Sequence, residues 1–353
     1  MNDKKLSALN VAVMYVGAIM GAGFASGRET WQFFGVFGYK GIIGALIFAV
    51  VFLITGHVIR CNAKILKTND MGKIIVPGGN KKLESFVGYF MAAILALVMV
   101  IMTAAGGSLL NQQFGLNYYV GGIVITVLVI ATVIGDFERI SRVFKYIMPV
   151  LCIAMILTCI VVVGSKPEVT DYSAEIVPSP VAPNWFIASL LYVSYNVMAL
   201  ISIVATSTIN AMSDKTAVIG TTMGGVFLGI LAMLILITVQ CDPAFSQMLD
   251  MPVLGYADRV SKALGYVYTL ILFFAIYSAA TSNFYGFTTK IKEGPNKNKK
   301  IIAAAVISFI LGLVGFKNIV SYVSPLIGYF GIIIIMMLFT NYIVLNKDKN
   351  NLR

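Results

Sequence analysis

Long, continuous apolar runs separated by short charged segments constrain this chain more than any other feature of its sequence. A helix that crosses a membrane needs roughly 20 apolar residues, whereas the strands of a membrane barrel would alternate apolar and polar residues. With 59% hydrophobic and 12% charged residues, the chain carries more apolar surface than a soluble fold can bury. We therefore expect an all-α polytopic membrane protein whose ten spans cover residues 8–36, 40–61, 84–110, 118–135, 144–165, 184–210, 217–240, 262–289, 301–316 and 319–345.

The basic residues predict how these spans are oriented. If the N-terminus is cytoplasmic, 20 of the 26 lysines and arginines lie at inner ends or loops, 5 lie outside, and Arg28 lies within the membrane. Such an excess on one side is the positive-inside pattern. We expect a multi-pass protein of the cell inner (plasma) membrane with both termini cytoplasmic. Because the cationic residues flank the apolar runs, the net charge of +11 indicates a lipid bilayer as partner and no nucleic acid.

A proline-containing linker divides the apolar runs into two sets of five. It covers residues 166–183 and is expected outside the membrane. Because five is an odd number, the second set would cross the membrane in the opposite sense, as in the inverted repeats of secondary transporters. We expect a first five-helix repeat at 1–165 and a second at 184–353, integrated in one transmembrane domain. The polar segment 242–260 is expected to be a structured external loop.

The first apolar run is interrupted by glycines and by two charges. Four glycines occur from Gly17 to Gly27, and Arg28 and Glu29 follow directly. A glycine costs about 1 kcal/mol relative to alanine in a helix, and a charge at bilayer depth costs at least ~2.5 kcal/mol unless it is paired or hydrated. Unwound backbone at that depth requires a protein interior or a water-filled cavity. We expect a broken helix here; close helix packing through small residues is the alternative.

Two further runs contain polar interruptions. The sixth carries Ser194, Tyr195 and Asn196 within an apolar stretch, which indicates either a second break or a helix with a polar face. Near the cytoplasmic end of the eighth, Thr281 and Ser282 are adjacent hydroxyls. Hard cations such as sodium prefer oxygen ligands, which hydroxyls and freed backbone carbonyls supply. The alternative is that both hydroxyls bond back to carbonyls of their own helix.

Together, these features resemble the leucine-transporter fold of the amino acid–polyamine–cation superfamily. The segment from Gly21 to Glu29 is also similar to that of bacterial YkvI-type membrane proteins. The resemblance covers all ten runs in order and implies a 5+5 inverted repeat with broken helices 1 and 6. In sodium-coupled members, carbonyls of the first helix break, one carbonyl of helix 8 and two hydroxyls there bind the ion. Carried over, the sodium ligands are Gly17, Met20, Ser278, Thr281 and Ser282.

The resemblance also implies a substrate at mid-membrane between the first and sixth helix breaks, where amide ends attract anionic groups and freed carbonyls attract cationic ones. The expected substrate-binding residues come from the first, third and sixth runs. They are Gly21, Ala22, Gly23, Phe24, Thr103, Gly107, Ser194, Tyr195 and Asn196. Arg28 and Glu29 have three open roles: an extracellular gate, substrate ligands for a carboxylate and an amine, or a structural ion pair.

These observations favour a sodium symporter that imports a small organic solute, such as an amino acid, by alternating access, with Na⁺ as coupling ion and no other cofactor. Proton coupling is the alternative, although the body of the fifth run carries no lysine and Lys145 lies only at its edge. The alternative substrates are a quaternary amine, an osmolyte or a nucleobase, and the alternative direction of transport is export. The alternative class of protein is a membrane ligand sensor that does not transport. An enzyme is not expected, since the membrane segments lack a metal-ligand cluster and His57 is the only histidine. The oligomeric state stays open.

Overall fold

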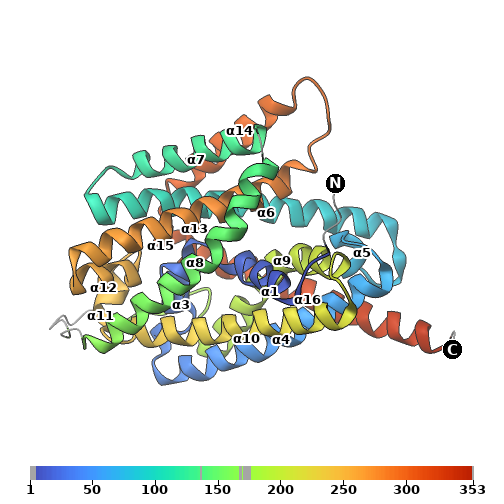
Figure 1. Cartoon of the computed structure of the whole chain (residues 1–353), viewed down its shortest axis with the longest axis horizontal. Helices are drawn as coiled ribbons and strands as arrows, with labels where there is room; N and C mark the ends of the chain where they lie inside the picture. Colours follow the sequence, from blue (N-terminus) through green and yellow to red (C-terminus); the bar gives the residue numbers. More distant parts are fainter. Residues whose placement is uncertain (1–4, 136, 167–168, 170–175, 352–353) are drawn as a thin grey trace.

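The chain folds into a bundle of helices (Figure 1). The structure, a computed structural model, describes residues 5–135, 137–166, 169 and 176–351. Within these residues, 7 helices are long and apolar enough to cross a membrane, which confirms the all-helical membrane architecture. They are α4 (Tyr39–Leu66), α6 (Lys81–Phe114), α8 (Phe137–Gly164), α9 (Trp185–Ile209), α10 (Asp214–Val239), α13 (Lys262–Thr288) and the segment Phe316–Lys347, which contains α15 (Phe316–Asn318), η3 (Ile319–Val323) and most of α16 (Ser324–Asn351).

Shorter helices complete the bundle. Two of them, α1 (Ala8–Ile19) and α7 (Tyr118–Ile134), are also apolar. A third, α14 (Lys297–Gly312), packs with α7 against α6 at one edge of the bundle (Figure 1). The remaining elements are α2 (Ala22–Ala25), α3 (Arg28–Phe33), η1 (Gly35–Phe37), α5 (Met71–Ile75), η2 (Pro77–Gly79), α11 (Pro243–Met248) and α12 (Pro252–Val260).

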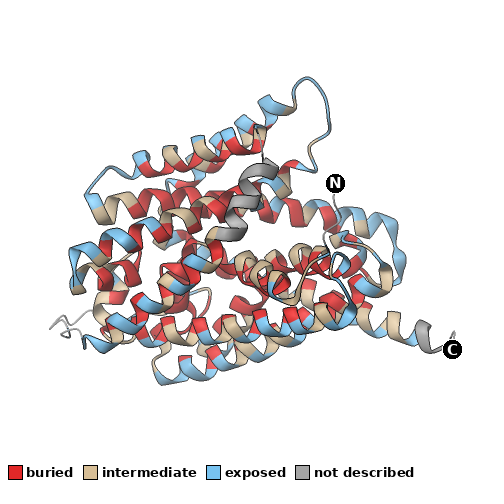
Figure 2. Cartoon of the chain, in the orientation of Figure 1, coloured by how far each residue is buried: buried red, intermediate tan, exposed pale blue. Residues whose placement is uncertain are grey.

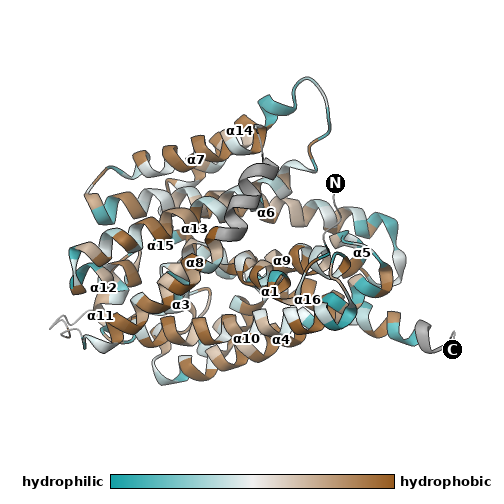
Figure 3. Cartoon of the chain, viewed as in Figure 1, coloured by the Kyte–Doolittle hydropathy of each residue, from teal (hydrophilic) through white to brown (hydrophobic). Residues whose placement is uncertain are grey.

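Large hydrophobic side chains lie on the outer faces of the bundle as well as in its interior. Figure 2 shows buried residues along the inward faces of the long helices, and Figure 3 shows hydrophobic residues on the outermost helices as well. Val50 in α4, Ile230 in α10 and Ile307 in α14 are examples of large hydrophobic side chains that are exposed. Soluble proteins rarely expose broad apolar patches, whereas lipid tails are as apolar as these side chains. The surface therefore suits a bilayer.

The first helix is broken, as the sequence predicted. α1 ends at Ile19, α2 starts after Gly21, and α3 starts after Gly27. Gly27 has a φ of 77°, in the left-handed region that glycine tolerates best. A Cβ at this position would lie only 2.7 Å from a methyl group of Val253. Glycine is therefore required here both by the backbone turn and by the close contact.

The predicted break in the sixth span is wrong. α9 is one continuous α-helix from Trp185 to Ile209. The Asn196 side-chain amide donates to the Tyr192 carbonyl at 2.9 Å, and the Ser194 hydroxyl lies 2.8 Å from the Leu190 carbonyl. Because carbonyls of their own helix satisfy these polar groups, the side chains require no unwound backbone. The segment is a regular helix that carries polar side chains.

The segment 242–260 is structured, as expected. It contains α11 and α12, which lie at the opposite end of the bundle from α5 (Figure 1). The Asp242 carboxylate pairs with Arg259 at 3.0 Å, and the Tyr256 hydroxyl donates to the Asp242 carbonyl at 2.7 Å. Burial raises the pKa of Tyr256 above its ordinary value, so this hydroxyl stays protonated and able to donate. We call residues 242–260 the outer cap.

Candidate functional site

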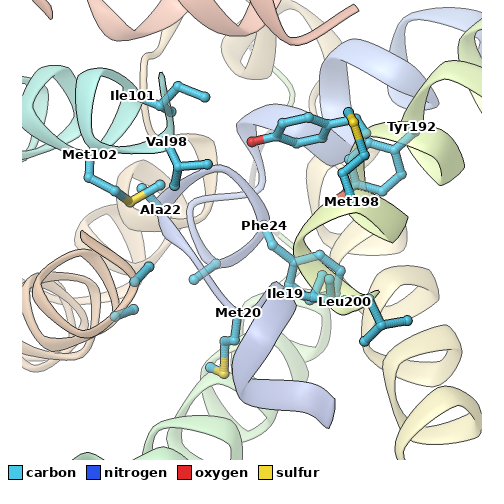
Figure 4. Packing of buried hydrophobic residues seen from close by; sticks show 14 of the residues in the cluster. Ile19, Met20, Ala22, Phe24, Val98, Ile101, Met102, Tyr192, Met198 and Leu200 are labelled. Carbon is cyan, nitrogen blue, oxygen red and sulfur yellow. The ribbon is translucent and has the colours of Figure 1, made fainter. Parts of the chain in front are cut away.

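The break between α1 and α2 frees backbone groups in the middle of the bundle. In a continuous helix the Gly21 amide would bond the Gly17 carbonyl, but here it donates to the Ile19 carbonyl at 2.7 Å. A Cβ added to Gly21 would lie 3.5 Å from the Ala279 side chain, so α13 approaches the break closely. Figure 4 shows the break between two sets of side chains, Val98, Ile101 and Met102 from α6 and Tyr192, Met198 and Leu200 from α9.

A small cavity of about 40 Å³ lies at this break, and we call it the central cavity. Its walls come from the broken first helix and from α6, α9 and α13. Most of the lining is apolar, with Leu95, Val98 and Met102 of α6 among the contributors. Its polar side chains are those of Glu29, Tyr195, Asn196 and Asn283. The cavity thus combines an apolar wall with a small set of polar groups, as in most small-molecule sites.

A second cavity, of about 310 Å³, adjoins the central cavity toward the end of the bundle where α1 begins, and we call it the inner cavity. Val13 and Gly17 of α1 line it, together with Ser202 of α9 and the exposed Ser282 of α13. On the opposite side of the central cavity, residues 22–36 are all buried. Five residues line both cavities, namely Ala18, Leu95, Ala199, Ala279 and Asn283.

Arg28 connects the first helix to the outer cap. Its Nη1 donates to the Leu249 carbonyl at 3.1 Å and lies 3.4 Å from the carbonyls of Ser246 and Gln247. Its Nη2 donates to the Gln32 side chain at 3.2 Å. Arg28 is 1% exposed, and the fork of donors in its guanidinium is well suited to holding several carbonyls at once. The cap is therefore held in place by a buried cation on α3.

The neighbouring Glu29 turns the other way, into the central cavity. It is only 4% exposed, and a Cβ added to Gly23 would lie 2.1 Å from its carboxyl group. The hydroxyls of Tyr192 and Tyr195 face the same carboxylate. Because the Arg28 side chain is bonded to the cap, Arg28 and Glu29 do not form an ion pair with each other. Of the roles considered for these residues, the mutual ion pair is wrong.

The structure places most of the predicted sodium ligands near the two cavities. Gly17, Ser278 and Ser282 line the inner cavity. Thr281 is fully buried, and its hydroxyl has no hydrogen-bond partner among the described residues. An unmade hydrogen bond of this kind costs about 1–3 kcal/mol, so the hydroxyl is free to serve as a ligand. Met20 is buried at the break, where its sulfur accepts from Cys152 at 3.3 Å.

Only some of the predicted substrate residues reach the central cavity. Gly21, Gly23, Phe24, Tyr195 and Asn196 line it. Ala22 is fully buried within α2, and Figure 4 shows it beside Met102.

Three of the predicted substrate residues do not line the central cavity. Thr103 and Gly107 line a separate cavity against α7 and α14, where a Cβ added to Gly107 would lie 2.7 Å from the Tyr118 carbonyl. Ser194 faces α16, with its hydroxyl 2.7 Å from the Gly328 carbonyl. Gly107 and Ser194 make close helix-packing contacts, and the cavity that Thr103 and Gly107 line, of about 410 Å³, is distinct from the central cavity.

The lining residues that the sequence did not reveal are apolar or come from an unexpected helix. On α6 the cavity wall is formed by Leu95, Val98 and Met102, which share one helix face by their spacing. The polar Thr103 lies on the next face and points away. Asn283, one residue after the predicted sodium hydroxyls, also lines the cavity. Its amide close to the predicted sodium hydroxyls is the signal in the sequence that could have drawn attention to it.

Comparison with known proteins identifies relatives of the whole chain. No family model matches it. The chain is 26% identical over 332 residues to YkvI, an uncharacterized membrane protein of Bacillus subtilis, covering 93% of this chain and 94% of the relative. It is also 21% identical over 348 residues to the uncharacterized protein YyaD of the same organism. This match covers 96% of this chain and 97% of YyaD.

Solved structures with a similar fold are membrane transporters. The nucleobase-cation-symport-1 family transporter Mhp1, in a closed conformation with bromovinylhydantoin bound, gives a TM-score of 0.55 at 14% identity and covers 94% of this chain and 75% of its own. The manganese transporter of Eremococcus coleocola gives a TM-score of 0.53 at 11% identity. The match covers 96% of this chain and 75% of the transporter chain. At such identities the likeness shows the fold alone, which is a leucine-transporter-type fold. These neighbours are transporters rather than enzymes.

Replacing Arg28 by alanine is expected to loosen the outer cap. Hydrogen bonds from a charged donor contribute about 1.5–3 kcal/mol, and the variant loses those of Arg28. The backbone bond from the Val253 amide to the Ser26 carbonyl, at 3.0 Å, would still hold the cap to the first helix. We expect hydrogen exchange at amides of residues 242–260 to become about tenfold faster or more, measured by mass spectrometry on the purified protein.

Arg60→Ala is the matched control, because Arg60 is also buried and bonds Asp214 at 2.7 Å outside the cap, on α4 and α10. Exchange in the cap is expected to stay unchanged in that variant. Equal exchange of the cap in Arg28→Ala and in the unmodified protein would contradict the role given to Arg28.

Proposed function

We propose that this chain is a secondary transporter that moves a small organic solute across the membrane by alternating access. The observation that carries the proposal is the place of the central cavity. It lies at a helix break, adjoins the inner cavity toward one end of the bundle, and is covered by the outer cap toward the other. A site that communicates with one side at a time is what alternating access requires. The transporter fold of the structural neighbours supports the same class.

The proposal includes ten membrane crossings in a plasma membrane. Three shorter units, α1–α3, α7 and α14, would cross in addition to the 7 long helices. The excess of basic residues at the end that holds α5 orients this end toward the cytoplasm. On this orientation both termini are cytoplasmic, the outer cap is extracellular, and the structure is an inward-facing state. The repeats at 1–165 and 184–353 are then inverted, although only the first begins with a broken helix.

In this scheme Arg28 is part of the extracellular gate. Its hydrogen bonds close the cap over the first helix break in the inward-facing state. Two further contacts support the closed position: Trp31 Nε1 donates to the Gln247 side chain at 2.8 Å, and Lys317 Nζ donates to the Gln247 carbonyl at 2.7 Å. Opening the outer path would require these contacts to separate together. In this scheme two cations, Arg28 and Lys317, hold carbonyls of the cap in the closed position.

We further propose that Na⁺ is the coupling ion, with no other cofactor. The ligands would be the carbonyls of Gly17, Met20 and Ser278 and the hydroxyls of Thr281 and Ser282. Two observations support this assignment: the Gly17 carbonyl has lost its helical donor, and the Thr281 hydroxyl has no partner among the described residues. Proton coupling stays the alternative; the side chain of Lys145 lies outside the described residues.

Sodium is expected to stabilise the purified protein, and the double variant Thr281→Ala with Ser282→Ala is expected to abolish this effect. A ligand at a hundredfold excess over its Kd stabilises the folded state by about 2.7 kcal/mol. The measurement is thermal unfolding in NaCl compared with KCl. Thr269→Ala is the control, because this hydroxyl lies on the same helix but donates to the Gly265 carbonyl at 2.8 Å. A sodium effect that survives in the double variant would refute the site.

Transport itself is tested in liposomes. We expect purified protein in liposomes with an inward sodium gradient to accumulate solute from a labelled mixture of amino acids and amines, beyond protein-free liposomes. Loss of accumulation when the gradient is dissipated would support symport. Accumulation that follows a proton gradient alone would favour proton coupling. Solutes that stabilise the protein without any flux would instead identify a membrane ligand sensor, and the transport proposal would fall.

A further inference from the structure

The central cavity contains a buried carboxylate that no cation among the described residues balances. Glu29 is 4% exposed and lines the cavity, and in the described part of the chain it forms no ion pair. Burying an ionised carboxylate is costly unless it is paired and hydrogen-bonded. Arg28, the cation next to it in sequence, is bonded to the outer cap. The site is therefore suited to receive a positive charge from a ligand.

Two asparagines add uncharged acceptors to the same cavity. Asn196 Nδ2 donates to the Tyr192 carbonyl at 2.9 Å, and Asn283 Nδ2 donates to the Ala279 carbonyl at 2.8 Å. A carboxamide whose nitrogen is bonded to its own helix has its Oδ1 left to offer, and that atom is an acceptor. Since both residues line the central cavity, it presents three side chains whose available oxygens accept hydrogen bonds.

We propose that the solute binds in the central cavity through a primary ammonium group, held by the Glu29 carboxylate and by Oδ1 of Asn196 and Asn283. This inference rests on the proposed function, because it names the chemical class of the transported solute. A primary ammonium has three N–H donors, which matches three acceptor side chains. A quaternary amine has none to offer, and a carboxylate in the same place would meet the negative charge of Glu29.

The dimensions of the two cavities agree with this arrangement. A cavity of about 40 Å³ exceeds the roughly 10–15 Å³ that a water-sized group needs, so an ammonium head fits there. The rest of the solute would extend along Leu95, Ala199 and Ala279 into the inner cavity of about 310 Å³. Because these three side chains are apolar, the part of the solute next to the ammonium group is expected to be apolar too.

The test uses the full-length protein in lipid nanodiscs and three probes that share an unbranched alkyl body. They are n-butylammonium, butyltrimethylammonium and pentanoate, each titrated at constant ionic strength while thermal unfolding is followed. We expect n-butylammonium to raise the unfolding temperature with a saturable dependence, and the other two probes to have little effect. No shift with n-butylammonium, or equal shifts with all three probes, would overturn the proposal.

Variants then assign the ammonium group to its acceptors. Glu29→Gln is expected to weaken the apparent affinity for n-butylammonium about tenfold or more, since hydrogen bonds to a charged group are the strong ones. Asn283→Ala should weaken it several-fold and decides the question if Glu29→Gln does not fold. Glu84→Gln, at the start of α6 and outside the cavity, is the control and should bind as the unmodified protein does. Unchanged affinity in both cavity variants would refute the site.

The outcome for this site is separable from the outcome for transport. Binding of n-butylammonium that depends on Glu29, without solute flux in liposomes, would support the ammonium site and refute the transporter. Solute flux that is unaffected by Glu29→Gln would support the transporter and refute the ammonium site.

Discussion

The unwinding of the first helix at Met20 and Gly21 is the constraint on which the functional architecture depends. Backbone that leaves the helical ladder at membrane depth is tolerated only inside protein or along a cavity, and here α6, α9 and α13 enclose it. The turn also sets the direction of α2 and α3. As a result, two consecutive charged residues reach different places: Arg28 the outer cap and Glu29 the central cavity.

Arg28 and Glu29 are both buried, but only Arg28 has its charge compensated by hydrogen bonds to the outer cap. Arg28 is surrounded by carbonyls of the cap and by Gln32, so its removal from water is compensated by hydrogen bonds within the protein. Glu29 has tyrosine hydroxyls beside it but no counter-cation among the described residues. A structural role would favour a paired carboxylate. In the proposed ammonium site, the Glu29 carboxylate and the neighbouring asparagine oxygens accept the hydrogen bonds of the solute.

Hydropathy and charge predicted the helical membrane architecture and the broken first helix, because both follow from local composition: continuous apolar runs, and glycines followed by two charges. The sequence left the unbroken α9 open as an alternative, because composition does not show whether Ser194 and Asn196 bond carbonyls of their own helix. The third-helix residues were misplaced for a related reason. Thr103 was chosen for its polarity, but the face of α6 that lines the cavity is apolar, and α6 packs here against α2 and α13.

Alternating access is the central claim, and thiol labelling from both sides of the membrane tests it most directly. With the four native cysteines replaced, Ser26→Cys reports on the space beneath the outer cap, and Ser202→Cys reports on the inner cavity. Labelling rates by a membrane-impermeant reagent would be compared in sodium and in potassium, with and without solute. The account predicts that any condition that raises labelling at position 26 lowers it at position 202. Rates that rise or fall together would contradict it.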